Sequence, residues 1–272
     1  KRSSNNPLRN NLAELSRPET RQVLQREIFP KRNTQFGEGL LTTFDLAFYP
    51  KDKGPYNFET SATRVDANGR LRFPQQAWGG LMRNIDQTDF ETSNIEFIEF
   101  WLQDPFITNT ANPGGGRLYF NLGNVSEDVL RDGKRLYENG LPTTTNNAPV
   151  DNTTVWGKVP ANPMQVTNAF SNDPADRPLQ DVGFDGLQDE EEKTKFAAYL
   201  SALQTNFGNG SPAYQKAFAD PSADNFKAYR DPSFDEGQVA GILERYKNIN
   251  NPHGNSPVAD NNTEFFNAFT QY

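Results

Sequence analysis

Apolar and aromatic residues are most concentrated between residues 94 and 123, in a chain that is otherwise polar. In the stretch RLYFNLG, Leu118, Phe120 and Leu122 alternate with other residues, and this period of two predicts a strand with one buried face. The preceding run IEFIEFWL is apolar on both strand faces, which favours a central strand covered on both sides. A helix would also group its aromatic residues, but the run is short and ends at an Asp-Pro pair. The two runs are separated by an Asn-Pro pair and three glycines, which predict a hairpin with a long loop.

Two further stretches in the first third of the chain have strand patterns. Between residues 40 and 49, Phe44, Leu46 and Phe48 lie on one face of a predicted strand. The Asn-Gly pair at residues 68–69 is the dipeptide that most favours a tight β-hairpin turn, and a short alternating segment follows it.

The pattern changes to helical spacing in the last third of the chain. Apolar residues recur every three or four positions from Phe196 to Phe207, and Gly208 is suited to end that helix. Ser211-Pro212 then opens a second helix, and the Ser and Glu at positions 233 and 236 predict the cap of a third.

Strands followed by helices predict an α+β fold, with an antiparallel β-sandwich part, jelly-roll-like, and then a helical, loop-rich part. The sandwich needs more strands than the pattern supplies, so further strands are expected beyond the last residue. Ser16 and Glu19 form a capping box that predicts one short helix before Pro30. The expected organisation is an N-terminal arm with this helix at 1–35, a β-sandwich-like domain at 36–138, an extended connector rich in Thr, Asn and Pro at 139–180, and a turn resembling a Ca²⁺ loop with a helical segment at 181–272.

The composition narrows the chemistry available to the chain. A net charge of −8 argues against a nucleic-acid surface, which needs clustered Lys and Arg. With no Cys and only His253, disulfides, thiolate sites, most zinc sites and Ser-His-Asp chemistry are excluded. Glu96 and Glu99 are an odd number of residues apart, so a strand places them on opposite faces and not as a catalytic pair. We therefore expect no enzyme activity. A mean hydropathy of −0.80 and the lack of a long apolar run predict no membrane insertion of this segment.

The sharpest local motif is the acidic stretch 181–192, DVGFDGLQDEEE. Aligned with the twelve-residue Ca²⁺ loop of an EF-hand, it has acidic residues at positions one, five, nine and twelve and glycine at six. Position three is Gly183, where an oxygen ligand is usual. The candidate ligands for Ca²⁺ are Asp181, Asp185, the carbonyl of Leu187, Asp189 and Glu192. The alternative is that Asp189 caps a helix whose acidic first turn needs no metal.

Large aromatic residues are a second set of candidate functional groups. Tyr56, Phe58, Trp78 and Trp156 could line a surface that binds sugars or proteins, or they could belong to the core. Together with the acidic motif, they give an alternative function for the chain, a jelly-roll carbohydrate-binding module stabilised by Ca²⁺.

Several long strings of the chain resemble one protein family. They are FDLAFYPKDKGPYNF, WGGLMRNIDQTDFETSNIEFIEFWLQDPF, LYFNLGNVSEDVLRDGKRLYENGLP, QDVGFDGLQDEE and ERYKNINNPHGNSP. They resemble SprA, also called Sov, the giant outer-membrane translocon of the type IX secretion system. The resemblance implies an internal segment of a protein-conducting β-barrel that acts in secretion and gliding motility. It implies as partners a PorV-type shuttle, a plug protein and secreted cargo.

The strand patterns place this segment outside the barrel wall of that family. Lipid-facing strands have about ten residues with one fully apolar face, whereas the strands predicted here are short and set among polar loops. We therefore expect a soluble, non-enzymatic domain with structural and partner or cargo-binding roles, in the extracellular cap more than on the periplasmic face. Because it starts without Met or a leader, the chain is expected to be a piece of a longer protein.

Overall fold

The structure is a computed structural model of the 272-residue chain. It describes residues 8–18, 21–32, 39–43, 47–82, 89–104, 106, 115–122, 141–152, 157–161, 173–176, 179, 185–225, 234, 241–245 and 267–271. The chain divides into two units, each built from separate stretches of sequence. Unit 1 contains Lys1–Ala47, Ile85–Gly123 and Tyr229–Tyr246, and unit 2 contains Phe48–Asn84, Asn124–Ala228 and Lys247–Tyr272.

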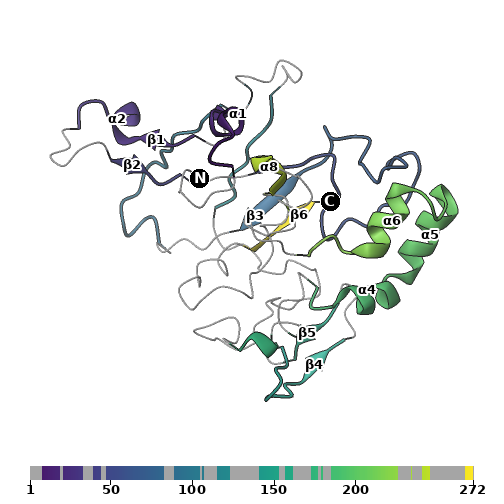
Figure 1. Ribbon diagram of the computed structural model, residues 1–272. Coiled ribbons are helices and arrows are strands. Elements are labelled where there is room, and N and C mark those ends of the chain that lie inside the picture. Colours follow the sequence, from purple (N-terminus) through teal and green to yellow (C-terminus); the bar gives the residue numbers. More distant parts are fainter. Residues whose placement is uncertain are drawn as a thin grey trace. The chain divides into compact units, whose positions relative to one another are not determined.

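The helices of unit 1 are short. Helix α1 (Leu12–Leu15) begins at Asn11, whose side-chain oxygen accepts a hydrogen bond of 3.1 Å from the Glu14 amide. Figure 1 shows α1 close to α8 (Ile242–Arg245), and Leu8, Leu15 and Ile242 form a small buried cluster there. A Glu14 carboxylate oxygen accepts a hydrogen bond of 2.9 Å from the Ile242 amide, so the two helices are joined by packing and by a side chain.

The rest of the N-terminal part contains one antiparallel pair of strands. β1 (Val23–Leu24) pairs with β2 (Leu40–Leu41), and α2 (Gln25–Ile28) follows β1 directly. A helix therefore forms before Pro30, as predicted, but Ser16 ends α1 instead of beginning that helix. The cap of α2 is supplied by Glu27, whose carboxylate accepts a hydrogen bond from the Leu24 amide. Glu19 and the centre of the strand predicted at 40–49 lie outside the described residues.

The hairpin predicted between residues 94 and 123 is not formed by the residues that the structure describes. Residues 95–104 and 115–122 belong to no strand, and their large apolar side chains are exposed. They do approach each other, since the rings of Phe100 and Phe120 lie 4.9 Å apart. An isolated pair of strands is barely stable in water, and the predicted strand at 95–102 is apolar on both faces, so the pair needs covering layers. We call residues 95–104 and 115–122 the exposed apolar segments.

Unit 2 contains two more antiparallel pairs of short strands. β3 (Gly79–Met82) pairs with β6 (Asn267–Gln271), with a register shift between Gly80 and Met82. β4 (Val150–Asp151) pairs with β5 (Val159–Pro160) inside the stretch predicted to be an extended connector. The 3₁₀ helix η2 (Pro174–Asp176) lies in the same stretch. The Asn-Gly turn at 68–69 forms as predicted, closing a single bridge between Val65 and Leu71.

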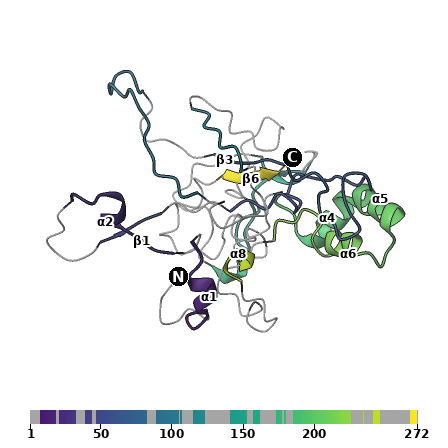
Figure 2. The same ribbon diagram turned by 90° about the horizontal axis from the view of Figure 1, so that it is seen from above.

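The first two helices predicted in the last third are present as α5 (Ala197–Phe207) and α6 (Pro212–Ala219). α4 (Asp189–Lys195) precedes them, and the three helices lie side by side in Figures 1 and 2. Gly208 follows α5, and Ser211 caps α6 through a hydrogen bond from the Tyr214 amide, as the sequence predicted. Of the third predicted helix, Phe234 and α8 fall within the described residues.

The fold is thus mixed, with a few helices and small two-stranded antiparallel sheets. The part of the chain that the structure describes shows no β-sandwich or jelly roll. The core of unit 2 lies between α5 and α6, where Leu200, Leu203 and Ala217 are buried and partly buried aromatic side chains surround them.

Candidate functional site

Acidic side chains of unit 2 gather where the start of α4 meets the loop after α6. Asp185 lies in the turn before α4, Asp189 and Glu192 lie in its first turn, and Asp220 and Asp224 lie in the loop. One oxygen from each of Asp185, Glu192 and Asp224 lies within 4.8 Å of the others, and the same holds for Asp189, Glu192 and Asp220. We call these five residues the acidic cluster.

Asp185 is positioned by the backbone on both sides of it. The amide of Lys158, just before β5, donates a hydrogen bond of 2.7 Å to the Asp185 carbonyl. Gly186 makes this approach possible, because its φ of +70° is in the left-handed region and an added Cβ would collide with the Lys158 carbonyl oxygen. The Asp185 carboxylate then accepts hydrogen bonds from the Leu187 amide at 2.9 Å and from the Ser222 hydroxyl at 2.7 Å.

Glu192 is the central member of the acidic cluster, since it belongs to both groups of three carboxylates. It is 1% exposed, although it lies in a helical turn that is otherwise acidic and open to solvent. Its Oε2 accepts a hydrogen bond of 2.9 Å from the Ser222 amide. Ser222 therefore binds both Asp185 and Glu192, and it fixes the loop against the helix.

The loop at residues 220–225 folds around its own acidic residues. The amides of Asp224 and Asn225 donate to the Asp220 carboxylate at 3.2 and 3.4 Å. Ala223, between Asp220 and Asp224, has a φ of +57°, which is costly for a residue with a side chain. The Asn225 side chain donates to Asp189 at 2.9 Å, which adds a second link between loop and helix.

Burial makes these carboxyl groups hard to ionise. Loss of water raises the pKa of Asp185 to about 7, against the opposing hydrogen bonds from Ser222 and Leu187. Burial and the neighbouring Asp185 charge raise the pKa of Glu192 to about 8. Burial also raises the pKa of Asp220. The carboxyl groups of the acidic cluster therefore stay ionised only when a nearby positive charge compensates for their burial.

Lys53 is a positive group that interacts electrostatically with the acidic cluster, and it comes from a distant part of the sequence. Its ammonium nitrogen is buried and has no hydrogen-bond partner among the residues that the structure describes. It lies over the ring of Phe58, 4.7 Å from the centroid, and 5.4 Å from the ring centroid of Tyr199. Burial lowers the pKa of Lys53 to about 8, and Asp220, then Asp224, Glu192 and Asp185, oppose that shift.

The aromatic rings beneath Lys53 pack closely with one another. Phe58 stacks on Phe196 at 4.4 Å and meets Tyr199 edge-on at 5.2 Å. Because Phe196 ends α4 and precedes α5, this contact holds both helices against the segment that carries Lys53.

Comparison with known proteins bears on the helical end of this site. Residues 198–271 match the family model SprA_N, described as motility related/secretion protein. The chain is related to SprA. The SprA match begins within α5 and ends with β6, so it includes Asp220 and Asp224 but neither Asp185 nor Glu192. No curated protein and no solved structure matches the chain significantly. Among the described residues of this SprA-related chain, no helix combines the length and apolar character needed to cross a membrane.

The structure brings together three of the five ligands predicted for Ca²⁺. Asp185 and Asp189 each lie near Glu192, but in separate groups of three carboxylates. Asp181 lies outside the described residues, and Leu187 is buried in the turn before α4. The alternative helix cap is also partly present, since α4 begins at Asp189, but its N-cap is Gln188.

Sequence reasoning missed the other half of the site. Asp220, Ser222 and Asp224 alternate as D-x-S-x-D directly after α6, a spacing similar to that of calcium loops, and this signal was available in the sequence. The sequence around Lys53 contains no comparable motif.

The four aromatic candidates do not form one surface among the described residues. Tyr56 is 6% exposed and Phe58 is part of the packing around Lys53, while Trp78 is 49% exposed. Trp156 lies outside the described residues. Of the three described candidates, Trp78 is the most exposed.

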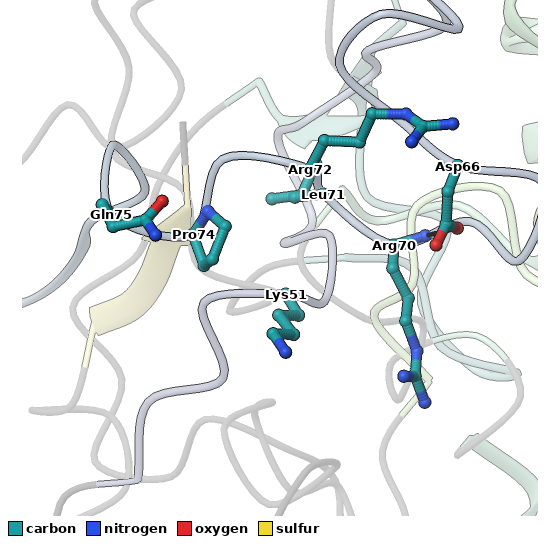
Figure 3. Close-up of a pocket in the computed structure, with 7 residues that line it drawn as sticks. All are labelled: Lys51, Asp66, Arg70, Leu71, Arg72, Pro74 and Gln75. Carbon is teal, nitrogen blue, oxygen red and sulfur yellow. Dashed lines mark hydrogen bonds between the residues drawn. The ribbon is translucent and has the colours of Figure 1, made fainter. Parts of the chain in front are cut away.

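A hollow of about 390 Å³ lies beside the Asn-Gly turn and is shown in Figure 3. Lys51, Arg70 and Arg72 contribute positive charge to its lining. Figure 3 shows the side chains of Arg70 and Arg72 pointing in opposite directions, and the Arg72 Nε is bound to two backbone carbonyls. The cations do not converge on one point, so this hollow lacks the geometry of a specific anion site.

Proposed function

We propose that the chain is a non-enzymatic domain of an SprA-type outer-membrane translocon that acts in type IX secretion and gliding motility. The match of residues 198–271 to the SprA_N motility and secretion family supports this proposal most directly. The domain has a structural role and contacts other secretion components, a PorV-type shuttle and a plug protein, and secreted cargo. It lies on the extracellular side more than on the periplasmic face. The net charge of −8 makes nucleic acid an unfavourable partner.

The exposed apolar segments of unit 1 are the surface that best suits such contacts. Their largest exposed side chains are Phe97, Trp101 and Tyr119, and Trp101 is 74% exposed. Exposed apolar surface of this kind marks sites that bind other proteins, because its burial removes water from a large area. Aromatic residues are also the ones that most often dominate the energy of protein interfaces.

A carbohydrate-binding module is the competing proposal, and it has less support. Flat sugar rings stack on exposed aromatic faces, so such a site needs several of them in one row. Tyr56 and Phe58 are used for packing in unit 2, which leaves Trp78 as the half-exposed member of the described set.

The proposal is tested in the full-length parent protein with the triple variant Phe97→Ser, Trp101→Ser, Tyr119→Ser. We expect partner capture in pull-downs to fall more than tenfold and cargo secretion to fall with it, since aromatic anchors contribute about 2 kcal/mol or more each. The matched control is Leu12→Ser, Phe29→Ser, Leu40→Ser, which removes exposed apolar residues of unit 1 outside these segments. Secretion and capture at the wild-type level, with equal amounts of parent protein, would reject the proposed surface.

A further inference from the structure

We propose that residues 95–104 bind an extended strand of another polypeptide in which apolar and basic residues alternate. The added strand pairs with the backbone of this segment and places its apolar side chains beside those of the exposed apolar segments. This inference rests on the proposed function, because it concerns the surface that contacts other proteins there. It adds the mode of binding and the sequence pattern of the partner.

The first argument is that the backbone of the exposed apolar segments is open. Residues 96–104 and 115–122 form no backbone-to-backbone hydrogen bond within the described part of the chain. The 95–104 segment is nevertheless held near both ends. The Ile95 amide donates to the Phe90 carbonyl at 2.9 Å, and the Gln103 side chain donates to the Pro18 carbonyl at 2.8 Å. A segment fixed at its ends, with unpaired donors and acceptors between them, is a template for an added strand.

The second argument is the match between the side chains of the two segments. The rings of Phe100 and Phe120 lie 4.9 Å apart, and a Cβ added at Gly116 would lie 3.2 Å from the ring of Phe106. These two contacts indicate that the segments run antiparallel. As strands in this register, they group six apolar residues on one face, each more than half exposed: Ile98, Phe100, Leu102, Leu118, Phe120 and Leu122. Because side chains of neighbouring strands contact each other, a partner strand with apolar residues on this face is favoured.

The third argument is the charge on the other face of the 95–104 segment. Alternation places Phe97, Glu99 and Trp101 on this face, and all three are exposed. A Lys or Arg on an added strand can meet the carboxylate of Glu99 and lie over the neighbouring aromatic rings. A second copy of this chain would bring another acidic segment and a net charge of −8, which opposes pairing at low salt. The partner is therefore basic at the positions that alternate with its apolar residues.

The test is a calorimetric titration of the whole chain with two short acetylated peptides at low salt. One peptide alternates Val with Lys and the other alternates Val with Glu, so the two differ in charge. We expect the basic peptide to bind and the acidic one to bind at least tenfold more weakly. Amide hydrogen exchange should slow at alternate residues between 96 and 102 when the basic peptide is bound, because every second residue of an edge faces the added strand.

A pair of matched variants tests the position of the site. Glu99→Lys should weaken binding of the basic peptide at least tenfold, because it sets like charges beside each other. The control Glu91→Lys makes the same change of net charge at an exposed residue outside the segment, and it should bind as the wild type does. An equal loss in both variants would overturn the proposal, because it would show diffuse attraction between opposite charges.

Three further results would overturn the proposed strand. They are no binding of the basic peptide, binding without slowed exchange at alternate amides, and the same slowed exchange in the chain alone, which would assign the site to a second copy. None of these measurements involves secretion. The proposed function is tested separately in the parent protein, so the failure of one can be told from the failure of the other.

Discussion

Lys53 shows at the scale of one residue how the fold treats buried charge. Its ammonium is buried over aromatic rings, and the carboxylates of the acidic cluster interact with it electrostatically without a hydrogen bond. The ammonium thus loses hydration without gaining a direct partner, which costs stability. The same loss of hydration lowers the pKa of Lys53 to about 8. The effect of Lys53 on stability therefore depends on pH.

We predict that Lys53→Met makes the chain more stable at neutral pH. The folded-state pKa of about 8 lies below the ordinary value of 10.5, so between these values the unfolded chain binds the proton more tightly. Wild-type stability therefore rises with pH across this window, by up to about 3 kcal/mol, and the variant lacks that rise. Met fills the same space and packs well on aromatic rings.

Urea unfolding from pH 7 to pH 10.5 measures the difference between the two proteins. The difference in free energy of unfolding should be largest near neutral pH and should become smaller toward the highest pH. Lys216→Met is the control, since that side chain is exposed and the variant keeps Lys53. A Lys53→Met protein that is less stable than the wild type at neutral pH would mean that the ammonium is the main counter-ion of the acidic cluster.

At the scale of elements, α5 and α6 followed from the sequence and most strands did not. The hydrogen bonds of α5 and its end at Gly208 are local, so the spacing of apolar residues and the cap at Ser211 contain the needed information. A strand needs a partner from elsewhere. The alternation around Leu118 indicates a face to be covered, but it does not say what covers it, and these residues stay unpaired here.

The candidate site shows the same contrast between residues of one local motif and residues brought together by packing. Asp185, Asp189 and Glu192 could be predicted because they belong to one short motif. Asp220 and Lys53 come from other parts of the chain, and only the packing of the helices places them beside that motif. Spacing along the sequence could not supply that arrangement.

The turn before α4 makes a prediction at this scale. Gly186→Ala should destabilise the chain by about 3 kcal/mol, because the left-handed φ disfavours a side chain and the new Cβ meets the Lys158 carbonyl. Gly210→Ala is the control, since a Cβ there meets nothing within 4 Å, and it should change stability by less than about 0.5 kcal/mol. Chemical unfolding monitored by circular dichroism measures both. Equal midpoints for Gly186→Ala and the wild type would show that the segment before β5 does not dock on this turn.

At the scale of the whole molecule, two opposing properties set how copies of the chain behave. The net charge of −8 keeps copies apart, while the exposed apolar segments offer surface that water solvates poorly. Repulsion between like charges is screened by salt, whereas apolar association is not. The balance between the two should therefore shift with ionic strength.

We predict that the isolated chain associates reversibly at high salt and much less at low salt. The triple variant Phe97→Ser, Trp101→Ser, Tyr119→Ser should remain monomeric in both conditions. Sedimentation velocity over a range of protein concentrations measures the association. The triple control at Leu12, Phe29 and Leu40 should behave as the wild type does, and a control that also stays monomeric would show that apolar exposure in general, not these segments, drives association.

The way Asp185 rests on Lys158 has a practical consequence for dissecting the protein. A fragment trimmed to the family boundary at residue 198 would keep the loop acids and discard Glu192, Asp185 and the strand that steadies them. Such a fragment would contain the acidic residues of the 220–225 loop without the α4 residues that this loop contacts. Expression fragments meant to retain the whole acidic cluster should begin upstream of Lys53, because the Lys53 ammonium lies over aromatic rings that include Tyr199 of α5.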